Sequence, residues 1–181
     1  VTDRIHGDIT VDCATIDDFV LLKSDGYPTY HLAHIVDDHA MAMTDVIRGD
    51  DWLASLPRHV LLFRAFDWDV PAYAHLPLLH NTQHKKLSKR DGDVSVESFL
   101  VWCLPQALVN FIALLGWNPT ADRDRYTIDE LIDLFDITKV NRSPAVLDLQ
   151  KLEWMNGEYI RTLAPAELIH AMRTANSQVN L

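Results

Sequence analysis

Short apolar runs alternate with stretches of helical spacing in the first half of the chain. Residues 18–23 (DFVLLK) form an apolar run that ends at the turn signal Ser24-Asp25-Gly26, which predicts a strand followed by a tight turn. Between residues 30 and 41, apolar side chains recur every three to four positions, which predicts a helix. Residues 44–48 (TDVIR) form a second strand-like run, and Gly49 ends it.

The next two elements continue this alternation. Asp50 and Asp51 begin a predicted helix that runs to about residue 65, because carboxylates suit the positive N-terminal end of a helix. Residues 74–79 (AHLPLL) are a third candidate strand, in which Pro77 predicts an edge strand or a broken one. Strands that alternate with helices are typical of an α/β sheet, whose ligands bind beyond the carboxyl ends of the strands.

Only helices are predicted from about residue 95 onward. Thr127 and Glu130 form a capping box, and Asn156-Gly157 is a stop signal. With these signals the apolar spacing predicts four helices, over residues 105–115, 127–135, 148–155 and 165–172. The expected fold class is therefore α/β followed by all-α, with an α/β part over residues 1–97 and a helical part over residues 98–181.

The composition is that of a folded, acidic protein. Hydrophobic residues make up 48% of the 181 residues, which is enough for a core, and the net charge of −10 argues against a non-specific nucleic-acid binder. No apolar run approaches the length of about 18 residues that a membrane span needs, and we expect no secretory leader. Cys13 and Cys103 form no CxxC pair and predict reduced, buried thiols in a cytoplasmic protein.

The segment HKKLSKRDGD concentrates four cations, Lys85, Lys86, Lys89 and Arg90, in an acidic chain. A lysine-rich loop is often only a solvated surface. However, Lys86 and Lys89 are spaced to lie on one side of a tight loop, where two ammonium groups would neutralise charge on a triphosphate and its leaving pyrophosphate.

Two further groups have more than one interpretation. The histidines and aspartates of YHLAHIVDDHAM resemble metal ligands, but the segment has no HExxH pattern and no cysteine partner, so polar residues of a cleft or of a helix surface are favoured. Arg48 ends a predicted buried strand. Its guanidinium suits a substrate carboxylate held by two hydrogen bonds, or a structural ion pair with Asp50 or Asp51.

Longer motifs along the chain resemble one family. They are DGYPTYHLA, VDDHAM, TDVIRGDDW, PLL, KKLSKRDGDVS, LPQALVNFIALLGW and LEWMNGEYI. In this order they resemble the bacterial-type glutamyl-tRNA synthetases, which are class I aminoacyl-tRNA synthetases, over essentially the whole chain. Residues 86–90 (KLSKR) match the KMSKS motif of that class, with leucine and arginine at two positions.

The resemblance implies an ATP-dependent ligase of protein biosynthesis. Such an enzyme activates L-glutamate to glutamyl-adenylate, with Mg²⁺ on the phosphates, and transfers the glutamyl group to the 3′ end of tRNA(Glu). Lys86 and Lys89 are the catalytic candidates. The implied nucleotide-binding residues are Trp52, Leu78, Leu79, Lys86, Ser88, Lys89 and Arg90. Those implied for glutamate are Tyr30, Arg48 and His34, where related sequences often have asparagine. No residue is implied as a metal ligand.

The resemblance also implies what the chain covers. It corresponds to the C-terminal half of a class I Rossmann-type catalytic domain (residues 1–97) and a helical stem-contact domain (98–181). The His-Ile-Gly-His motif is expected upstream of Val1 and the anticodon-binding domain downstream of Leu181. We therefore expect these 181 residues to be a fragment that is inactive alone, from a cytoplasmic, monomeric enzyme. Alternatives are a glutaminyl-tRNA synthetase, an enzyme that glutamylates a tRNA base, and a non-catalytic tRNA-binding or interaction module.

Overall fold

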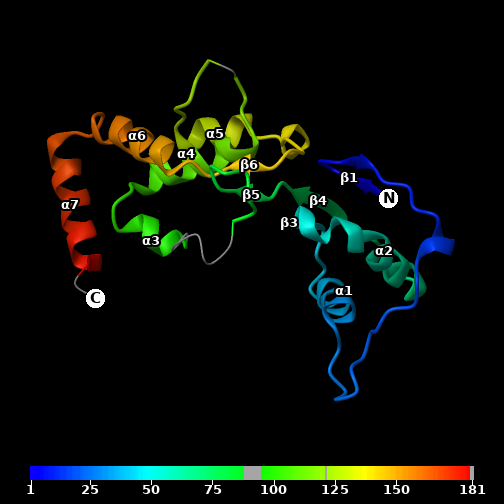
Figure 1. Cartoon of the computed structure of the whole chain (residues 1–181). Helices are drawn as coiled ribbons and strands as arrows, with labels where there is room; N and C mark the ends of the chain where they lie inside the picture. The colour runs from blue at the N-terminus through cyan, green and yellow to red at the C-terminus, as the bar shows by residue number, and fades with distance from the viewer. Residues whose placement is uncertain (88–94, 121, 180–181) are drawn as a thin grey trace. The chain divides into compact units, whose positions relative to one another are not determined.

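The computed structural model describes residues 1–87, 95–120 and 122–179, with their side chains up to residue 175 (Figure 1). The chain divides into two compact units: the first contains residues 1–77 and 137–142, and the second contains residues 78–136 and 143–181. The predicted boundary after residue 97 separates two functional domains, which need not coincide with these compact units, and it stays a prediction.

A four-stranded sheet with the order β2-β1-β4-β3 lies in the first unit. Its strands are β1 (Thr2–Asp3), β2 (Gly7–Asp8), β3 (Asp45–Gly49) and β4 (Ala72–Leu76). β4 is parallel to β3 along its whole length and to β1 at Tyr73, whereas β2 is antiparallel to β1. β4 is therefore an inner strand, and the predicted edge position is wrong. The alternative of a broken strand is confirmed, because Pro77 separates β4 from β5 (Leu79–His80).

Two helices of the first unit match the predicted spacing. α1 (Tyr30–Ala40) forms as predicted, and the helix expected from Asp50 begins as a 3₁₀ helix, η2 (Asp50–Ser55), before it continues as α2 (Leu56–Ala65). Their buried side chains form two small cores. One contains Ile35, Leu62 and Phe63, and the other contains Leu56, Val60 and Tyr73, so that α2 is anchored on β4.

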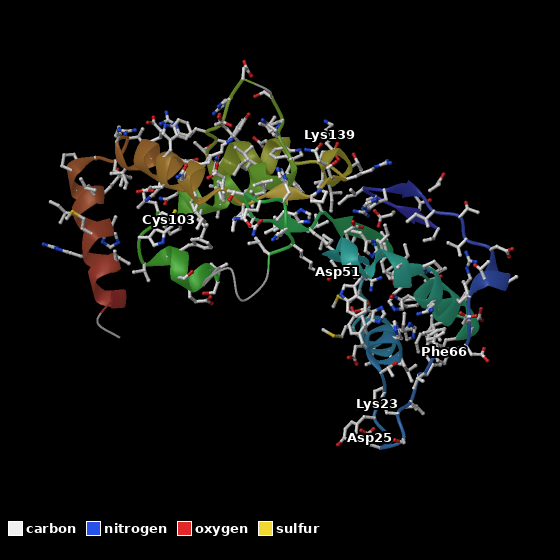
Figure 2. The ribbon with its side chains drawn as sticks, in the orientation of Figure 1. Lys23, Asp25, Asp51, Phe66, Cys103 and Lys139 are labelled. Atoms are coloured by element: carbon white, nitrogen blue, oxygen red, sulfur yellow. The ribbon has the colours of Figure 1, made fainter. Side chains whose placement is uncertain are left out.

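The strand predicted over residues 18–23 is wrong, but the turn that follows it is confirmed. The chain turns back at Gly26, whose φ of 84° suits glycine, and Leu22 forms only an isolated bridge with Pro28. Figure 2 shows Lys23 and Asp25 at the tip of this loop. The run is apolar because Phe19 and Leu21 pack against the Ile35 core, not because it belongs to the sheet.

The second unit is mainly helical, as predicted. Its core lies where two helices, α4 (Pro105–Gly116) and α6 (Leu149–Ile160), pack together, and it contains Phe99, Cys103, Ala107, Leu108, Phe111, Leu152 and Met155. The predicted capping box is present at Thr127 and Glu130. The elements of this unit are β5, α3 (Val96–Leu100), α4 (Pro105–Gly116), α5 (Ile128–Leu134), β6 (Ala145–Val146), α6 (Leu149–Ile160) and α7 (Pro165–Val179); a 3₁₀ helix, η3 (Ile137–Lys139), lies in the other unit.

Asn156 does not stop α6, which continues to Ile160. Its amide group is buried and accepts a hydrogen bond from Leu104 N at 2.9 Å, while it donates to Trp102 O at 3.0 Å. An Asn-Gly pair ends a helix when one of its residues adopts the left-handed conformation, and neither Asn156 nor Gly157 has a positive φ. Here the side chain instead satisfies two backbone groups that precede α4, so the prediction of a stop was wrong.

Replacing Asn156 with alanine should lower the free energy of unfolding by roughly 2–3 kcal/mol, because it leaves one buried N–H and one carbonyl without partners. Chemical denaturation of the variant and of wild type measures this loss. Glu153→Ala is the matched control, since Glu153 is an exposed residue of the same helix. Equal midpoints for Asn156→Ala and the control would contradict the assigned role of the amide.

The two cysteines differ in their surroundings. Cys103 is buried, as predicted, and burial raises the pKa of its thiol to about 11. Cys13 is exposed, which corrects the prediction, because it lies in a short 3₁₀ helix capped by Asp12 rather than in the core. In the described parts of the chain, no helix is long and apolar enough to cross a membrane.

Candidate active site

Polar side chains gather where β3 and β4 end, at the edge of the sheet where the sequence predicted a ligand. Arg48 is the fourth residue of β3 and lies opposite His75 of β4 in the parallel register. α2 contributes His59, α1 contributes His31, and β1 contributes Asp3. We call these five residues the arginine–histidine cluster.

A continuous chain of hydrogen bonds joins the cluster. Arg48 Nε donates to His75 Nε2 at 3.0 Å, and His75 Nδ1 lies 2.7 Å from Asp3 Oδ2. On the other side, Arg48 Nη2 lies 3.1 Å from His59 Nδ1, and His59 Nε2 lies 2.9 Å from His31 Nδ1. Asp3, His59 and His75 expose at most 1% of their surface, so water does not compete for these bonds.

Burial keeps the imidazoles of the cluster neutral. It lowers the pKa of His59 to about 2, with further lowering by His34 and Arg48. It also lowers the pKa of His75, and the bond to Asp3 only partly offsets this effect. Burial raises the pKa of Asp3, but hydrogen bonds from His75 and the backbone outweigh it, so the pKa lies below its ordinary value and the group is a carboxylate.

Arg48 keeps unused hydrogen-bonding capacity. Its Nη1 is buried and has no hydrogen-bond partner among the described residues. The rings of Tyr73 and Trp52 lie 5.3 Å and 5.9 Å from the guanidinium carbon, within the range of cation–π attraction. A buried donor without a partner is unfavourable, so this position suits an anionic ligand.

Three of the residues that the sequence singled out lie beside Arg48: Tyr30, His34 and Trp52. The Tyr30 ring stacks on His34 with centroids 4.7 Å apart and lies 4.3 Å from that of Trp52. His34 Nδ1 lies 3.0 Å from the Tyr30 carbonyl oxygen, so Nδ1 carries the proton and the buried Nε2, which has no partner in the described structure, is an acceptor. Burial lowers the pKa of His34, so the neutral ring is favoured.

The alternative of a structural ion pair for Arg48 finds no support at Asp50. The Asp50 carboxylate lies 3.3 Å from His6 Nε2. The hydrogen bonds of the guanidinium go to His59 and His75, which are neutral acceptors. The positive charge of Arg48 is therefore not neutralised by either of these partners.

The depressed pKa of His59 predicts a loss of stability in mild acid. The unfolded chain takes up a proton at His59 below pH 6.5, whereas the folded chain does so only near pH 2, so stability falls as the pH drops through this window. The slope for one such group is about 1.4 kcal/mol per pH unit. His59→Gln should therefore lose roughly 2 kcal/mol less than wild type between pH 7 and pH 5. Denaturant midpoints at both pH values measure the difference.

Val60→Ala is the control for this experiment. Val60 is buried in the Leu56 and Tyr73 core and does not titrate, so its loss should lower stability equally at both pH values. If His59→Gln kept the full pH dependence of wild type, the assignment of the acid sensitivity to His59 would be wrong.

The residues predicted to bind the nucleotide are only partly described. Trp52 lies in η2, beside Arg48, whereas Leu78, Leu79 and Lys86 belong to the second compact unit. Leu79 pairs with Ala145 of β6. The exposed Lys86 forms an isolated antiparallel β-bridge with His80, near the start of the basic segment HKKLSKRDGD. Ser88, Lys89 and Arg90 lie outside the described residues. Among the described residues, no group of three or more His, Cys, Asp or Glu side chains could hold a metal ion.

Sequence reasoning missed Asp3, His59 and His75. Asp3 lies in the polar opening VTDRIHGD and does not stand out, whereas His59 and His75 each lie within an apolar stretch, His75 in the alternating run AYAHL. This signal, a titratable side chain on the buried face of a strand or helix, was available. Its meaning depends on Arg48, which contacts His75 only because β3 and β4 pair in register.

Known proteins are similar to this chain in sequence. Residues 1–154 match the family described as tRNA synthetases class I (E and Q), catalytic domain. A glutamate–tRNA ligase of Clostridium botulinum (strain Hall) is 50% identical over 163 residues, covering 90% of this chain and 34% of that protein. One from Clostridium kluyveri is 48% identical over 171 residues, covering 94% of this chain and 35% of that protein. The chain thus spans about a third of the length of these relatives.

Solved structures agree with the sequence matches. A crystal structure of a glutamate tRNA ligase from Elizabethkingia meningosepticum, in complex with its amino acid, superimposes with a TM-score of 0.85 and 36% sequence identity. The match covers the whole of this chain and 40% of that one. Together with the family match over most of the residues, it shows that the chain belongs to the catalytic domains of the class I tRNA synthetases for glutamate and glutamine.

Proposed function

We propose that the protein carrying this chain is a glutamate–tRNA ligase. The observation that carries the proposal is Arg48: a buried guanidinium, bonded to neutral histidines, whose Nη1 has no partner among the described residues. Such a group suits a carboxylate, because a hydrogen bond between two charged groups is stronger than one between neutral groups. A glutamine side chain offers one carbonyl oxygen and no charge, so the same group favours glutamate.

Glutamate binding is assigned to Arg48, Tyr30 and His34. Arg48 holds the side-chain carboxylate. Tyr30 is half-exposed and stacks on His34 and Trp52, so that it forms an aromatic wall beside the guanidinium. His34 Nε2 is an acceptor and therefore suits an N–H of the substrate, such as its ammonium group.

ATP binding is assigned mainly to the basic segment. Lys86 and Lys89 stabilise the charge that develops as pyrophosphate leaves, which is the main task of protein groups in phosphoryl chemistry. The Mg²⁺ that the reaction needs is held by the phosphates, and we assign it no protein ligand. The residues proposed to contact the nucleotide are Trp52, Leu78, Leu79, Lys86, Ser88, Lys89 and Arg90.

The reaction then has two steps. The α-carboxylate of glutamate attacks the α-phosphorus of ATP, the bond to the β-phosphate breaks, and glutamyl-adenylate and pyrophosphate form. The terminal ribose hydroxyl of tRNA(Glu) next attacks the activated carbonyl and releases AMP. Residues 1–97 belong to the catalytic domain in this proposal, and residues 98–181 form a helical domain that contacts the tRNA stem.

The test is tRNA charging by the full-length protein. With ATP, Mg²⁺ and labelled glutamate, it should charge an in vitro transcript of tRNA(Glu). Because a transcript carries no modified bases, charging it excludes an enzyme that glutamylates a tRNA base. A transcript whose terminal ribose has been oxidised by periodate is the negative control and should stay uncharged.

Two outcomes would overturn the proposal. Charging with glutamine in preference to glutamate would assign the protein to the glutaminyl branch. Binding of the transcript without any charging would assign it to the non-catalytic tRNA-binding modules.

A further inference from the structure

The proposed function uses Arg48 but not the three buried groups that hold it. Asp3, His59 and His75 are more deeply buried than any of the described residues assigned above to substrate, and they come from a strand, a helix and another strand. Burial of three titratable groups is costly unless each is fully hydrogen-bonded. What they accomplish can be read from the direction of their hydrogen bonds.

Arg48 fixes the position of every proton in the cluster. A guanidinium only donates, so His75 Nε2 and His59 Nδ1 must both accept. The proton of His75 therefore sits on Nδ1 and is donated to Asp3, and that of His59 sits on Nε2 and is donated to His31. Each of these two imidazoles is thus held in one tautomer by its two hydrogen bonds, one with Arg48 and the other with Asp3 or His31.

The same bonds fix the orientation of the guanidinium. Nε and Nη2 are bound to imidazoles contributed by two different elements, β4 and α2, so the plane of the group cannot rotate without breaking a buried bond. Both hydrogens of Nη1 remain available. The acceptors are neutral, so the positive charge is left for the ligand.

We propose that Asp3, His75 and His59 are positioning residues of the glutamate site: they hold Arg48 in one orientation through tautomer-locked imidazoles and so set the preference for a carboxylate over an amide. The inference rests on the proposed function. A carboxylate in place of either imidazole would hold the arginine equally well but would neutralise it, and the preference for glutamate would be lost.

The structural alternative is that the cluster only satisfies buried polar atoms. The surroundings of Asp3 are consistent with this alternative, because its Oδ1 also accepts hydrogen bonds from Ile5 N and His6 N at 2.9 Å each. The two roles differ in what an acceptor at His75 can restore. Glutamine places a carbonyl oxygen near the position of Nε2 and can accept from Arg48, whereas phenylalanine fills the space without any acceptor.

The experiment compares His75→Phe with His75→Gln in the full-length enzyme, by ATP–pyrophosphate exchange in the presence of tRNA. His75→Phe should raise KM for glutamate roughly 30-fold, which corresponds to about 2 kcal/mol. It should leave KM for ATP within about 3-fold, since none of the residues proposed to bind the nucleotide belongs to the arginine–histidine cluster. His75→Gln should bring KM for glutamate back to within about 5-fold of wild type.

Asp3→Asn is the second variant, and it tests whether Asp3 fixes the tautomer of His75. Its Oδ1 still accepts from Ile5 N and His6 N, but an amide nitrogen now meets Nδ1 of His75 and favours a proton on Nε2, which opposes the Arg48 Nε–H. ¹⁵N spectra of labelled histidine should show the His75 proton moving from Nδ1 to Nε2. KM for glutamate should rise roughly 10-fold, with the ratio of glutamate to glutamine activity falling alongside.

Val60→Ala is the stability control, because it opens a cavity in the core next to Tyr73 without touching the cluster. It should lower the thermal midpoint and leave KM for glutamate within about 2-fold. Equal KM values for His75→Phe and His75→Gln, or a lowered midpoint with unchanged KM in His75→Phe, would overturn the inference and leave the proposed function standing. A wild-type protein with no glutamate-dependent exchange would overturn both.

Discussion

Replacing Arg48 with lysine in the full-length protein should lower kcat/KM for glutamate roughly 30- to 1,000-fold, the equivalent of about 2–4 kcal/mol. Lysine keeps the charge but presents a single ammonium group in place of a planar fork. It cannot donate to His59 and His75 and at the same time reach a carboxylate at the position of Nη1. The desolvated substrate carboxylate would be left poorly paired.

The activity with glutamine separates recognition from folding. Glutamine lacks the charge that Arg48 is proposed to hold, so its weak activity should change less than that of glutamate. A structural ion pair would instead change stability by about 0–1 kcal/mol and leave substrate preference alone. A normal KM for glutamate together with a lowered thermal midpoint would therefore mean that the role of Arg48 is structural.

Replacing Lys89 with alanine should lower kcat for glutamate activation by roughly 10²–10³ while KM for glutamate stays nearly unchanged. This prediction rests on the sequence, since Lys89 lies outside the described residues. The ammonium group is expected to act on charge that develops only in the transition state, so the loss should appear in the chemical step. Single-turnover formation of the adenylate measures that step directly.

Lys85→Ala is the matched control for Lys89. Lys85 is an exposed lysine just before the KLSKR motif, and no role is assigned to it. Its removal should change kcat less than about 3-fold, because only general attraction between the charges is lost. Unchanged adenylate formation in Lys89→Ala, or an equal loss in Lys85→Ala, would remove the catalytic role from Lys89.

Local signals predicted the helices better than the strands. α4 begins at its proline, and α5 begins at its capping box, because these signals act within one turn of the chain. Four short elements were not predicted: β1, β2, α3 and β6. Most of them are only two residues long, which is too short for a repeating pattern of apolar and polar residues to be detected. The run at 18–23 was misread because packing against a helix and pairing in a sheet both favour apolar side chains.

The candidate site could be predicted only in part. Arg48 stood out because a buried arginine at the end of a strand should pair with an anion. The hydrogen-bonded cluster around it could not be found from spacing, because Asp3 and His75 are 72 positions apart and meet through the pairing of β1 with β4. Contacts that depend on strand register become predictable only once the strand order is known.

The central claim, that the free edge of Arg48 receives the side chain of glutamate, is tested most directly by a structure of the full-length protein with bound glutamate. The account predicts that the side-chain carboxylate lies about 2.7–2.9 Å from Arg48 Nη1. The bonds from Arg48 Nε to His75 and from Nη2 to His59 should be retained, with His34 Nε2 facing an N–H of the substrate. Glutamate bound with its side chain away from Arg48, and Nη1 bonded to a protein group instead, would contradict the account.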